Sequence, residues 1–268
     1  MNYPVILAGA GPGDEELITI KLQKNIAIAD IIITDRLVNP LIITNHCNSN
    51  ALIIQTGKQG YNQNSYTQSE INTLIVAHAS AGKRVLRLKG GDIALYSNIL
   101  DELEALLANQ IPFQIIPGIS AFSGASAYTG IPLTAKGFSR GVQILSFNQT
   151  SEYTNADWQR MATSKDSLVV YMGGKNMQLL VALLVENGLD AATPIAIIAE
   201  ATTAYQNIQV NTLKGLLDHF PDTAFVSPSL IIIGAVVELY KKFNWFKSAG
   251  EIGSVFNELE EKITGSCN

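Results

Sequence analysis

The sequence predicts an α/β protein made of two halves. Three observations support this prediction: short apolar runs resembling buried strands recur along the chain, glycine-rich turns follow several of them, and segments of helical period lie between them. Strand, glycine turn, helix and strand in that order form a βαβ unit, which implies a parallel sheet. With 268 residues, the chain has enough length for two modest domains.

The first βαβ unit lies at the N-terminus. Residues 4–8 predict a strand that ends in the turn Gly9-Ala-Gly-Pro-Gly13, and Asp14 stands at the predicted N-cap of the next helix. Residues 31–34 predict the second strand, which ends at Asp35. The intervening helix is expected from the spacing of Leu17, Ile20, Lys21, Lys24, Ala27 and Ile28.

The same alternation continues to residue 117. Thr67-Gln-Ser-Glu70 is a capping box that opens a predicted helix. A strand over residues 84–88 breaks at Gly90-Gly91-Asp92, and a strand over residues 113–116 ends at Pro117-Gly118. The apolar positions expected on the two helices of this region are Ile71, Leu74, Ile75 and Ala79, then Leu100, Leu103, Leu106 and Leu107.

The second half has a different texture. Residues 120–130 are rich in small side chains, which indicates a closely packed helix, and residues 176–186 predict another helix that ends at Asn187-Gly188. Four further strands are expected over residues 141–147, 167–172, 194–199 and 230–233. We therefore predict an N-terminal domain over residues 1–117, a second over 118–242, and an extension over 243–268 that forms an appended helix or a frayed tail.

Composition restricts the class of function. Apolar residues make up 47% and charged residues 15%, and the net charge of −5 argues against a general nucleic-acid partner. Two cysteines predict no disulfide framework and favour a cytoplasmic protein. No apolar run is long enough to span a membrane, and the N-terminal residues resemble a first strand rather than a signal peptide.

The first glycine loop alone is a weak signal. Its spacing is G-x-G-x-G with Pro12 inside it, whereas the dinucleotide fingerprint is G-x-G-x-x-G with an acid about 20 residues on. Asp35 falls near that place, so a nicotinamide oxidoreductase stays open as an interpretation. A simple tight turn between strand and helix is the other interpretation.

The whole series of motifs is more specific. In order, the chain carries GAGPGD (9–14), TDRLV (34–38), GKQG (57–60), GKRVLRLKGGD (82–92), PGISA (117–121), GIPLT (130–134), VVYMGG (169–174), TPIAII (193–198) and PSLIIIG (228–234). This series resembles the tetrapyrrole methylase family over about residues 4–240, and within it the branch that acts on uroporphyrinogen III. The resemblance implies two α/β domains, an active site in the cleft between them that holds S-adenosyl-L-methionine, and a homodimer.

The implied activity is carbon methylation. Two methyl groups would pass from S-adenosyl-L-methionine to uroporphyrinogen III, giving precorrin-2 for siroheme or cobalamin synthesis and S-adenosyl-L-homocysteine as the other product. Such a reaction needs donor and acceptor held in line, and a group that removes a proton from the ring. No metal is expected, because His46, His78 and His219 lie far apart in sequence.

The resemblance also implies the cofactor residues. They are Pro12, Gly90, Gly91, Asp92, Leu95, Ser120, Ala121, Met172 and Ala201. Glycine lets a ligand touch the main chain. For residues 90–92 the alternative is a tight turn capped by Asp92, and for Met172 it is a core methionine. Ala201 stands where the family usually has glycine, so its methyl group narrows that wall.

Two residues match the family's proton-transfer groups. Asp35 matches the proton acceptor, and Lys58 matches a proton donor or charge-stabilising lysine. The alternatives are an N-cap or a partner of Arg36 for Asp35, and a solvated loop lysine for Lys58.

The departures from the family pattern lie on the expected acceptor side. Asn98 replaces an arginine, Asp101 replaces a glutamate, and Ala135-Lys136 replaces a His-Arg pair. The acceptor carries many carboxylates, which guanidinium groups suit well. The cations left to bind it are Arg36, Lys58, Lys89, Lys136 and Arg140, and of these residues we place Lys136, together with Asp101, at the substrate site.

Two further interpretations stay open. The acceptor is a later corrin-ring precursor in one of them. In the other, the chain is a non-catalytic relative that binds S-adenosyl-L-methionine, an interpretation suggested by the arginine missing at position 98.

Overall fold

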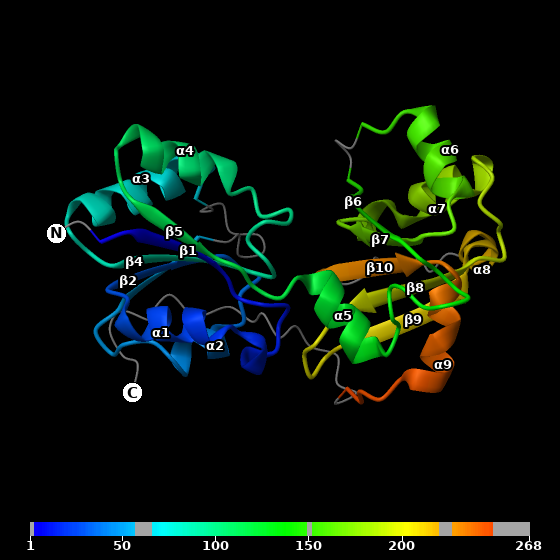
Figure 1. Cartoon of the computed structure of the whole chain (residues 1–268), viewed down its shortest axis with the longest axis horizontal. Helices are drawn as coiled ribbons and strands as arrows, with labels where there is room; N and C mark the ends of the chain where they lie inside the picture. The colour runs from blue at the N-terminus through cyan, green and yellow to red at the C-terminus, as the bar shows by residue number, and fades with distance from the viewer. Residues whose placement is uncertain (1–2, 57–65, 149–151, 220–226, 249–268) are drawn as a thin grey trace. The chain divides into compact units, whose positions relative to one another are not determined.

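The computed structural model describes residues 3–56, 66–148, 152–219 and 227–248. The chain divides into two compact units, one ending at Ala121 and the other beginning at Phe122. Each unit is built on a five-stranded sheet with helices on both faces (Figure 1). The predicted class, α/β with two α/β units, is confirmed. The extension expected over residues 243–268 falls mostly outside the described residues.

The first unit has an all-parallel sheet with strand order β3-β2-β4-β1-β5. Its strands are β1 (Val5–Gly9), β2 (Ile31–Thr34), β3 (Leu52–Gln55), β4 (Val85–Lys89) and β5 (Phe113–Ile116). Its helices are η1 (Glu15–Leu17), α1 (Ile20–Ile28), α2 (Pro40–Thr44), α3 (Gln68–Ser80) and α4 (Leu100–Ala108). Helices α1 and α2 cover one face and α3 and α4 the other, as crossover connections require (Figure 1).

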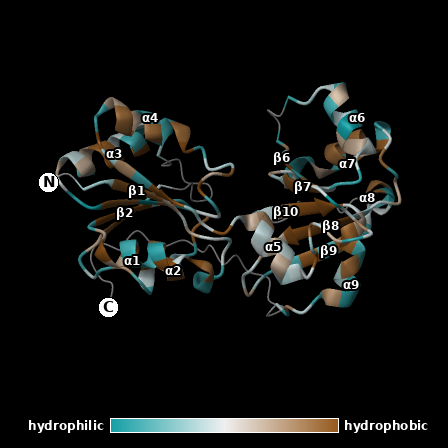
Figure 2. Ribbon diagram, viewed as in Figure 1, coloured by the Kyte–Doolittle hydropathy of each residue, from teal (hydrophilic) through white to brown (hydrophobic). Residues whose placement is uncertain are grey.

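The core of this unit lies on both faces of the sheet. Strands β1 and β2 are buried and hydrophobic along their length (Figure 2). Leu22, Ile26 and Ile42 pack on one face, and Ile71 and Ile75 on the other. A strand buried on both sides lacks alternation, which is why these strands read as continuous apolar runs.

The predicted N-terminal helix differs in its start and in its buried face. Asp14 caps only the 3-10 turn η1 and accepts a hydrogen bond from the Glu16 amide, whereas Thr19 caps α1. The break rotates the helix, so Leu22 and Ile26 are buried while Ile20 is exposed. The expected apolar stripe was therefore wrong.

Helix α3 confirms its prediction and α4 corrects one. The Thr67 capping box is present at the start of α3. On α4, Leu100 and Leu107 are exposed, and a buried position is taken by Glu102. The spacing of the leucines in α4 did not indicate that the carboxylate of Glu102 lies on the buried face of this helix.

The second unit has a mixed sheet with strand order β6-β7-β10-β8-β9. Strands β6 and β7 are parallel, and the remaining neighbours are antiparallel. Its strands are β6 (Val142–Ser146), β7 (Ser167–Tyr171), β8 (Pro194–Ala199), β9 (Asn207–Thr212) and β10 (Ser229–Ile233). Its helices are α5 (Ala121–Thr129), α6 (Asn155–Thr163), η2 (Gly174–Asn176), α7 (Met177–Glu186), α8 (Leu213–Asp218), η3 (Ala235–Leu239) and α9 (Tyr240–Phe243).

Several elements of the two units were not predicted from the sequence, among them β3, β9, α2, α6 and α8. Strands β3 and β9 lie at sheet edges, where few apolar contacts are needed, and β9 has a largely polar sequence. Helix α2 has only five residues. Helix α6 begins at a second capping box, Thr154 with Asp157, a local signal that is present in the sequence.

Two further findings bear on the composition argument. Cys47 is disulfide-bonded, a bond that the prediction of no disulfide framework did not anticipate. Within the ranges that the structure describes, no helix combines the length and apolarity that crossing a bilayer needs.

Candidate active site

The carboxyl ends of the parallel strands in the first unit bring the glycine loops together. Gly11 and Gly91 form a two-way backbone bridge, with N–H to O distances of 2.7 and 3.0 Å. The Gly118 amide donates to Asp92 Oδ2 at 2.8 Å. The loops after β1, β4 and β5 therefore form one backbone-lined edge, the place where ligands gather in open α/β sheets.

Close backbone approach explains why glycine is needed at this edge. A β-carbon on Gly9 would lie 2.5 Å from the Gly91 carbonyl oxygen and 2.9 Å from the Gly118 nitrogen. Gly91 itself adopts φ +67°, a conformation that favours glycine, and the space beside it is open apart from the Ala121 nitrogen at 3.7 Å. The missing side chain of Gly91 thus leaves space beside the main chain, while its N–H and C=O groups are bonded to Gly11.

Asp92 holds this loop in shape. Its Oδ1 accepts a hydrogen bond from the Ala94 amide at 2.9 Å, while Oδ2 binds Gly118. Residues 90–92 thus form the tight turn capped by Asp92 that was the alternative interpretation of this loop. The turn still leaves open space beside Gly91. A direct contact of Asp92 with the cofactor stays a prediction.

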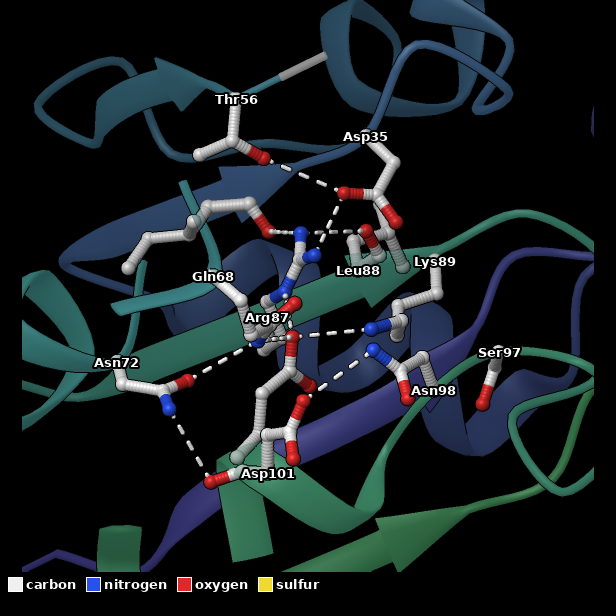
Figure 3. Close-up of polar contacts among 12 residues, drawn as sticks. Asp35, Thr56, Gln68, Asn72, Arg87, Leu88, Lys89, Ser97, Asn98 and Asp101 are labelled. Carbon is white, nitrogen blue, oxygen red and sulfur yellow. Dashed lines mark hydrogen bonds and ion pairs between the residues drawn. The ribbon is translucent and has the colours of Figure 1, made fainter. Parts of the chain in front are cut away.

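Asp35 follows β2, the strand next to β4. Its Oδ1 accepts from Arg87 Nη2 at 2.5 Å and from the Thr56 hydroxyl at 3.2 Å, and its side chain is 31% exposed (Figure 3). The ion-pair partner is Arg87 rather than Arg36, and the helix that follows is capped by Asn39. Neither alternative weighed for Asp35 is therefore what the structure shows.

Arg87 sits inside a buried charge cluster that also contains Glu102 and Lys89. Glu102 Oε1 accepts from Arg87 Nε and from Lys89 Nζ, both at 2.9 Å. The side chain of Glu102 is 0% exposed and that of Arg87 2% exposed. Two cations and two carboxylates, Asp35 included, balance in charge, which is what burial requires.

The charge balance keeps Arg87 ionised. Burial alone lowers the pKa of its guanidinium, but the charges of Asp35 and Glu102 and the hydrogen bonds to both outweigh that effect. The pKa of Arg87 therefore lies above its ordinary value. The group that faces Asp35 is a permanent cation.

Three functional candidates were missed by sequence reasoning: Arg87, Glu102 and Thr56. The signal for the first was present, because Arg87 and Lys89 alternate with leucines in one strand and so share a face. Two cations on the inner face of a buried strand require acids opposite them. Lys89 is also a correction, since it is buried and paired instead of available to an acceptor.

The expected acceptor-side residues are not members of the buried charge cluster. Asp101 is exposed and accepts from the Asn98 side-chain amide at 3.3 Å (Figure 3). Lys136 is exposed in the turn closed by the Ala135–Ser139 bridge of the second unit. Lys58 lies outside the described residues.

A second set of expected cofactor residues lies at one edge of the second sheet. Strands β7 and β8 both run antiparallel to β10, so they end at the same edge. Just past these ends, Met172, Glu200 and Thr202 adopt φ of 59°, 48° and 69°. Met172 is 49% exposed, so it is no core methionine, and Ala201 is half-buried between the other two. Backbone strain of this kind is concentrated at functional sites.

The remaining expected cofactor residues belong to the first unit. Pro12, Leu95, Ser120 and Ala121 are all half-buried. Pro12 follows the bridge residue Gly11, and Ala121 lies beside Gly91. In the part of the chain that the structure describes, no group of three or more histidine, cysteine or acidic side chains is arranged to hold a metal ion.

Two α/β units, the first with glycine loops meeting at the carboxyl ends of its strands, define an α/β protein of the two-unit class. The family model "Tetrapyrrole (Corrin/Porphyrin) Methylases" matches residues 4–217. The chain belongs to this family.

Curated relatives are similar along almost the whole chain. Siroheme synthase of Nitrosomonas europaea is 39% identical over 247 residues, which cover 92% of this chain and 52% of that protein. Siroheme synthase 2 of Aeromonas salmonicida is 41% identical over 248 residues, covering 92% and 51%. The chain thus spans about half the length of these relatives.

Solved structures share the fold. Uroporphyrin III C-methyl transferase of Thermus thermophilus matches with a TM-score of 0.74 and 27% identity, covering 88% of this chain and 94% of that one. A structure of the same enzyme complexed with S-adenyl homocysteine matches with a TM-score of 0.73. A cobalt precorrin-4 methyltransferase, at 22% identity and a TM-score of 0.78, shares the fold alone.

Proposed function

We propose that this chain is an S-adenosyl-L-methionine-dependent C-methyltransferase that methylates uroporphyrinogen III twice to give precorrin-2, for siroheme or cobalamin synthesis. The observation that carries the proposal is the shared sheet edge of the first unit. There, the open space beside Gly91 and the carboxylate of Asp35 follow adjacent strands, β4 and β2. The named activity of the Thermus enzyme supports the choice of acceptor.

The donor site fits the residues present. S-adenosyl-L-methionine, when bound, supplies a methyl group on a positively charged sulfur. Gly91 lacks a side chain and so leaves space for the donor beside the main chain, and the Gly11–Gly91 bridge and Asp92 fix that main chain in advance. Pro12, Gly90, Leu95, Ser120 and Ala121 are proposed as further donor contacts of the first unit, and Met172 and Ala201 of the second.

Asp35 is proposed as the proton acceptor. When a ring carbon gains a methyl group from the sulfonium, the ring system must lose a proton to return to neutrality, and a partly exposed carboxylate is suited to accept it. Arg87 and Thr56 hold Oδ1, and no hydrogen bond to Oδ2 is found among the described residues, so that oxygen is open toward an incoming proton. Lys58 is proposed as the proton donor or charge-stabilising lysine.

The acceptor side is proposed to use Asp101 and Lys136. A polycarboxylate acceptor needs cations, and Lys136 presents an exposed ammonium group. We also propose a homodimer in the cytoplasm, on the resemblance alone. The other half of the siroheme synthase relatives has no counterpart in these residues, and its activity is not proposed for this chain.

The test is an anaerobic assay with uroporphyrinogen III and S-adenosyl-L-methionine. Asp35→Asn should lower kcat by roughly 100-fold or more, as loss of a general base does. Asp30→Asn is the matched control, because Asp30 precedes the same strand and pairs with Arg84 instead. Full activity in Asp35→Asn would disprove the assignment of the base.

One observation favours a second candidate acceptor, a later corrin-ring precursor. Asn98 supplies no charge where the family has arginine, and Lys89 is committed to Glu102, so the acceptor side departs from the pattern of the branch that acts on uroporphyrinogen III. Parallel assays with both acceptor types decide between them. A strong preference for the corrin precursor would overturn the first choice.

A further inference from the structure

Glu102 is a fully buried charged residue that is linked to the proposed base, Asp35, through Arg87. Its side chain is 0% exposed, and its Oε1 is shared by Arg87, Lys89 and, at 3.5 Å, the Gln68 side-chain amide. Its Oε2 is buried and, among the described residues, has no hydrogen-bond partner. Leaving one carboxylate oxygen unsatisfied in the core is costly, so packing alone does not account for an acid at this position.

The connection from Glu102 to Asp35 runs through a single side chain. Arg87 Nε binds Glu102 at one end of the guanidinium, and Nη2 binds Asp35 Oδ1 at the other. Its Nη1 donates to the carbonyl oxygens of Ile33 and Leu88, at 3.3 and 3.4 Å. The rigid planar group is thereby held on three sides.

We propose that Glu102 is a positioning residue for proton transfer: by holding Arg87 Nε, it keeps the guanidinium from turning its full fork onto Asp35. The proposal rests on the proposed function, in which Asp35 accepts the proton. With Glu102 in place, Arg87 covers Oδ1 and leaves Oδ2 open. Without that charge, the buried cation has Asp35 as its one carboxylate partner, and a two-pronged pair would cover both oxygens.

The lysine beside Arg87 serves the same balance. Lys89 Nζ also donates to Glu102 Oε1, and Lys89 directly precedes Gly90 and Gly91. Glu102 therefore offsets one of the two positive charges of β4, those of Arg87 and Lys89. The net charge that faces Asp35 is then about that of one cation. The elements packed around this cluster are β2, β3, β4, α3 and α4. The charged or polar partners that they and the residues just after them contribute are Asp35, Thr56, Arg87, Lys89, Gln68 and Glu102.

The test uses Glu102→Gln, which keeps the shape of the side chain and removes its charge. We expect kcat to fall roughly 10- to 100-fold, in the range that a misplaced catalytic group costs. The acidic limb of the kcat–pH profile should move to lower pH, because an uncompensated cation favours the Asp35 carboxylate. The Kd for S-adenosyl-L-homocysteine, measured by calorimetry, should stay unchanged. Glu104→Gln, on the exposed face of the same helix, is the control and should behave as the wild type.

The double variant Asp35→Asn/Glu102→Gln separates this proposal from the proposed function. If Glu102 acts through Asp35, the double variant is no slower than Asp35→Asn. Losses that multiply, or a Glu102→Gln enzyme with wild-type kcat and pH profile, would overturn the positioning role while leaving Asp35 as the base. Full activity in Asp35→Asn would instead remove the proposed base itself.

A variant that keeps the charge covers the case in which Glu102→Gln does not fold. Glu102→Asp shortens the side chain by one methylene and displaces Arg87 without unbalancing the charge. We expect an intermediate loss of kcat with an unmoved acidic limb. Wild-type kcat in a folded Glu102→Asp enzyme would count against the proposal.

Discussion

Arg87 Nη2 lies 2.5 Å from Asp35 Oδ1, and this ion pair joins two adjacent parallel strands at the edge where both end. Arg87 is in register with Ile33, two residues before Asp35. The pair is asymmetric, since the guanidinium is 2% exposed while the carboxylate is 31% exposed. The cation is thus part of the core, and the acid is part of the surface of the site.

The first prediction concerns this cation. Arg87→Lys should lower the free energy of unfolding by about 3 kcal/mol, because one ammonium group cannot reach two carboxylates and leaves a buried charge poorly paired. Urea denaturation measures the change. Arg84→Lys is the control at the start of the same strand, where the pair with Asp30 is more exposed and the loss should be clearly smaller. Equal losses in the two variants would contradict the difference in burial.

The second prediction tests the close approach of the glycine loops. Gly9→Ala should destabilise the protein by about 2 kcal/mol and weaken S-adenosyl-L-homocysteine binding, because the added methyl group would push Gly91 and Gly118 away. Gly82→Ala is the control: it has φ +73° but open space, so it should cost about 1 kcal/mol and leave binding unchanged. Unchanged binding in Gly9→Ala would argue against this edge as the donor site.

The third prediction uses the strained backbone at Met172. Met172→Gly should raise stability by about 1 kcal/mol, since glycine adopts φ 59° without steric cost, yet it should weaken S-adenosyl-L-homocysteine binding. Gln110→Gly relieves a similar φ of 55° outside the proposed site and should stabilise without changing affinity. Thermal melts and calorimetry measure both quantities. Equal affinity in the two variants would remove Met172 from the proposed donor contacts.

The fourth prediction concerns pH and stability. Hydrogen bonds from the Arg84 side chain and backbone lower the pKa of Asp30 from 3.8 to about 2. A lowered carboxyl pKa stabilises the fold at pH values above the unfolded pKa, and the contribution disappears as pH falls through the folded value. Asp30→Asn should therefore cost about 1 kcal/mol at pH 7, after allowance for solvent screening of this partly exposed pair.

The measurement that checks it is urea denaturation of both proteins between pH 7 and pH 3. The difference in the free energy of unfolding should shrink steadily as pH falls below the unfolded pKa of 3.8. A difference that stayed constant over this range would show that the Arg84 pair is not its origin.

Local signals were sufficient for much of the fold. Thr67 with Glu70 predicted the start of α3, and the glycine turns after β1 and β4 were predicted because helix capping and turn chemistry involve residues close in sequence. The short edge strands β3 and β9 were missed, because strands at a sheet edge need little apolar pattern. The prediction of which face of α1 is buried was wrong, because the chain leaves helical geometry at Ile18 and α1 starts anew at Ile20.

The sequence by itself determined the order of strands and helices, the glycine loops between them and the family to which the chain belongs, since these depend on neighbouring residues and on the series of motifs. Tertiary structure decided which charges face one another. Arg87 and Asp35 are 52 positions apart, and nothing in their spacing indicates a pair. Folding brings β2 and β4 together, and burial makes each charge on their inner face require a partner. For this reason Glu102 pairs with Arg87, and Lys89 is bound to Glu102 instead of being available to a ligand.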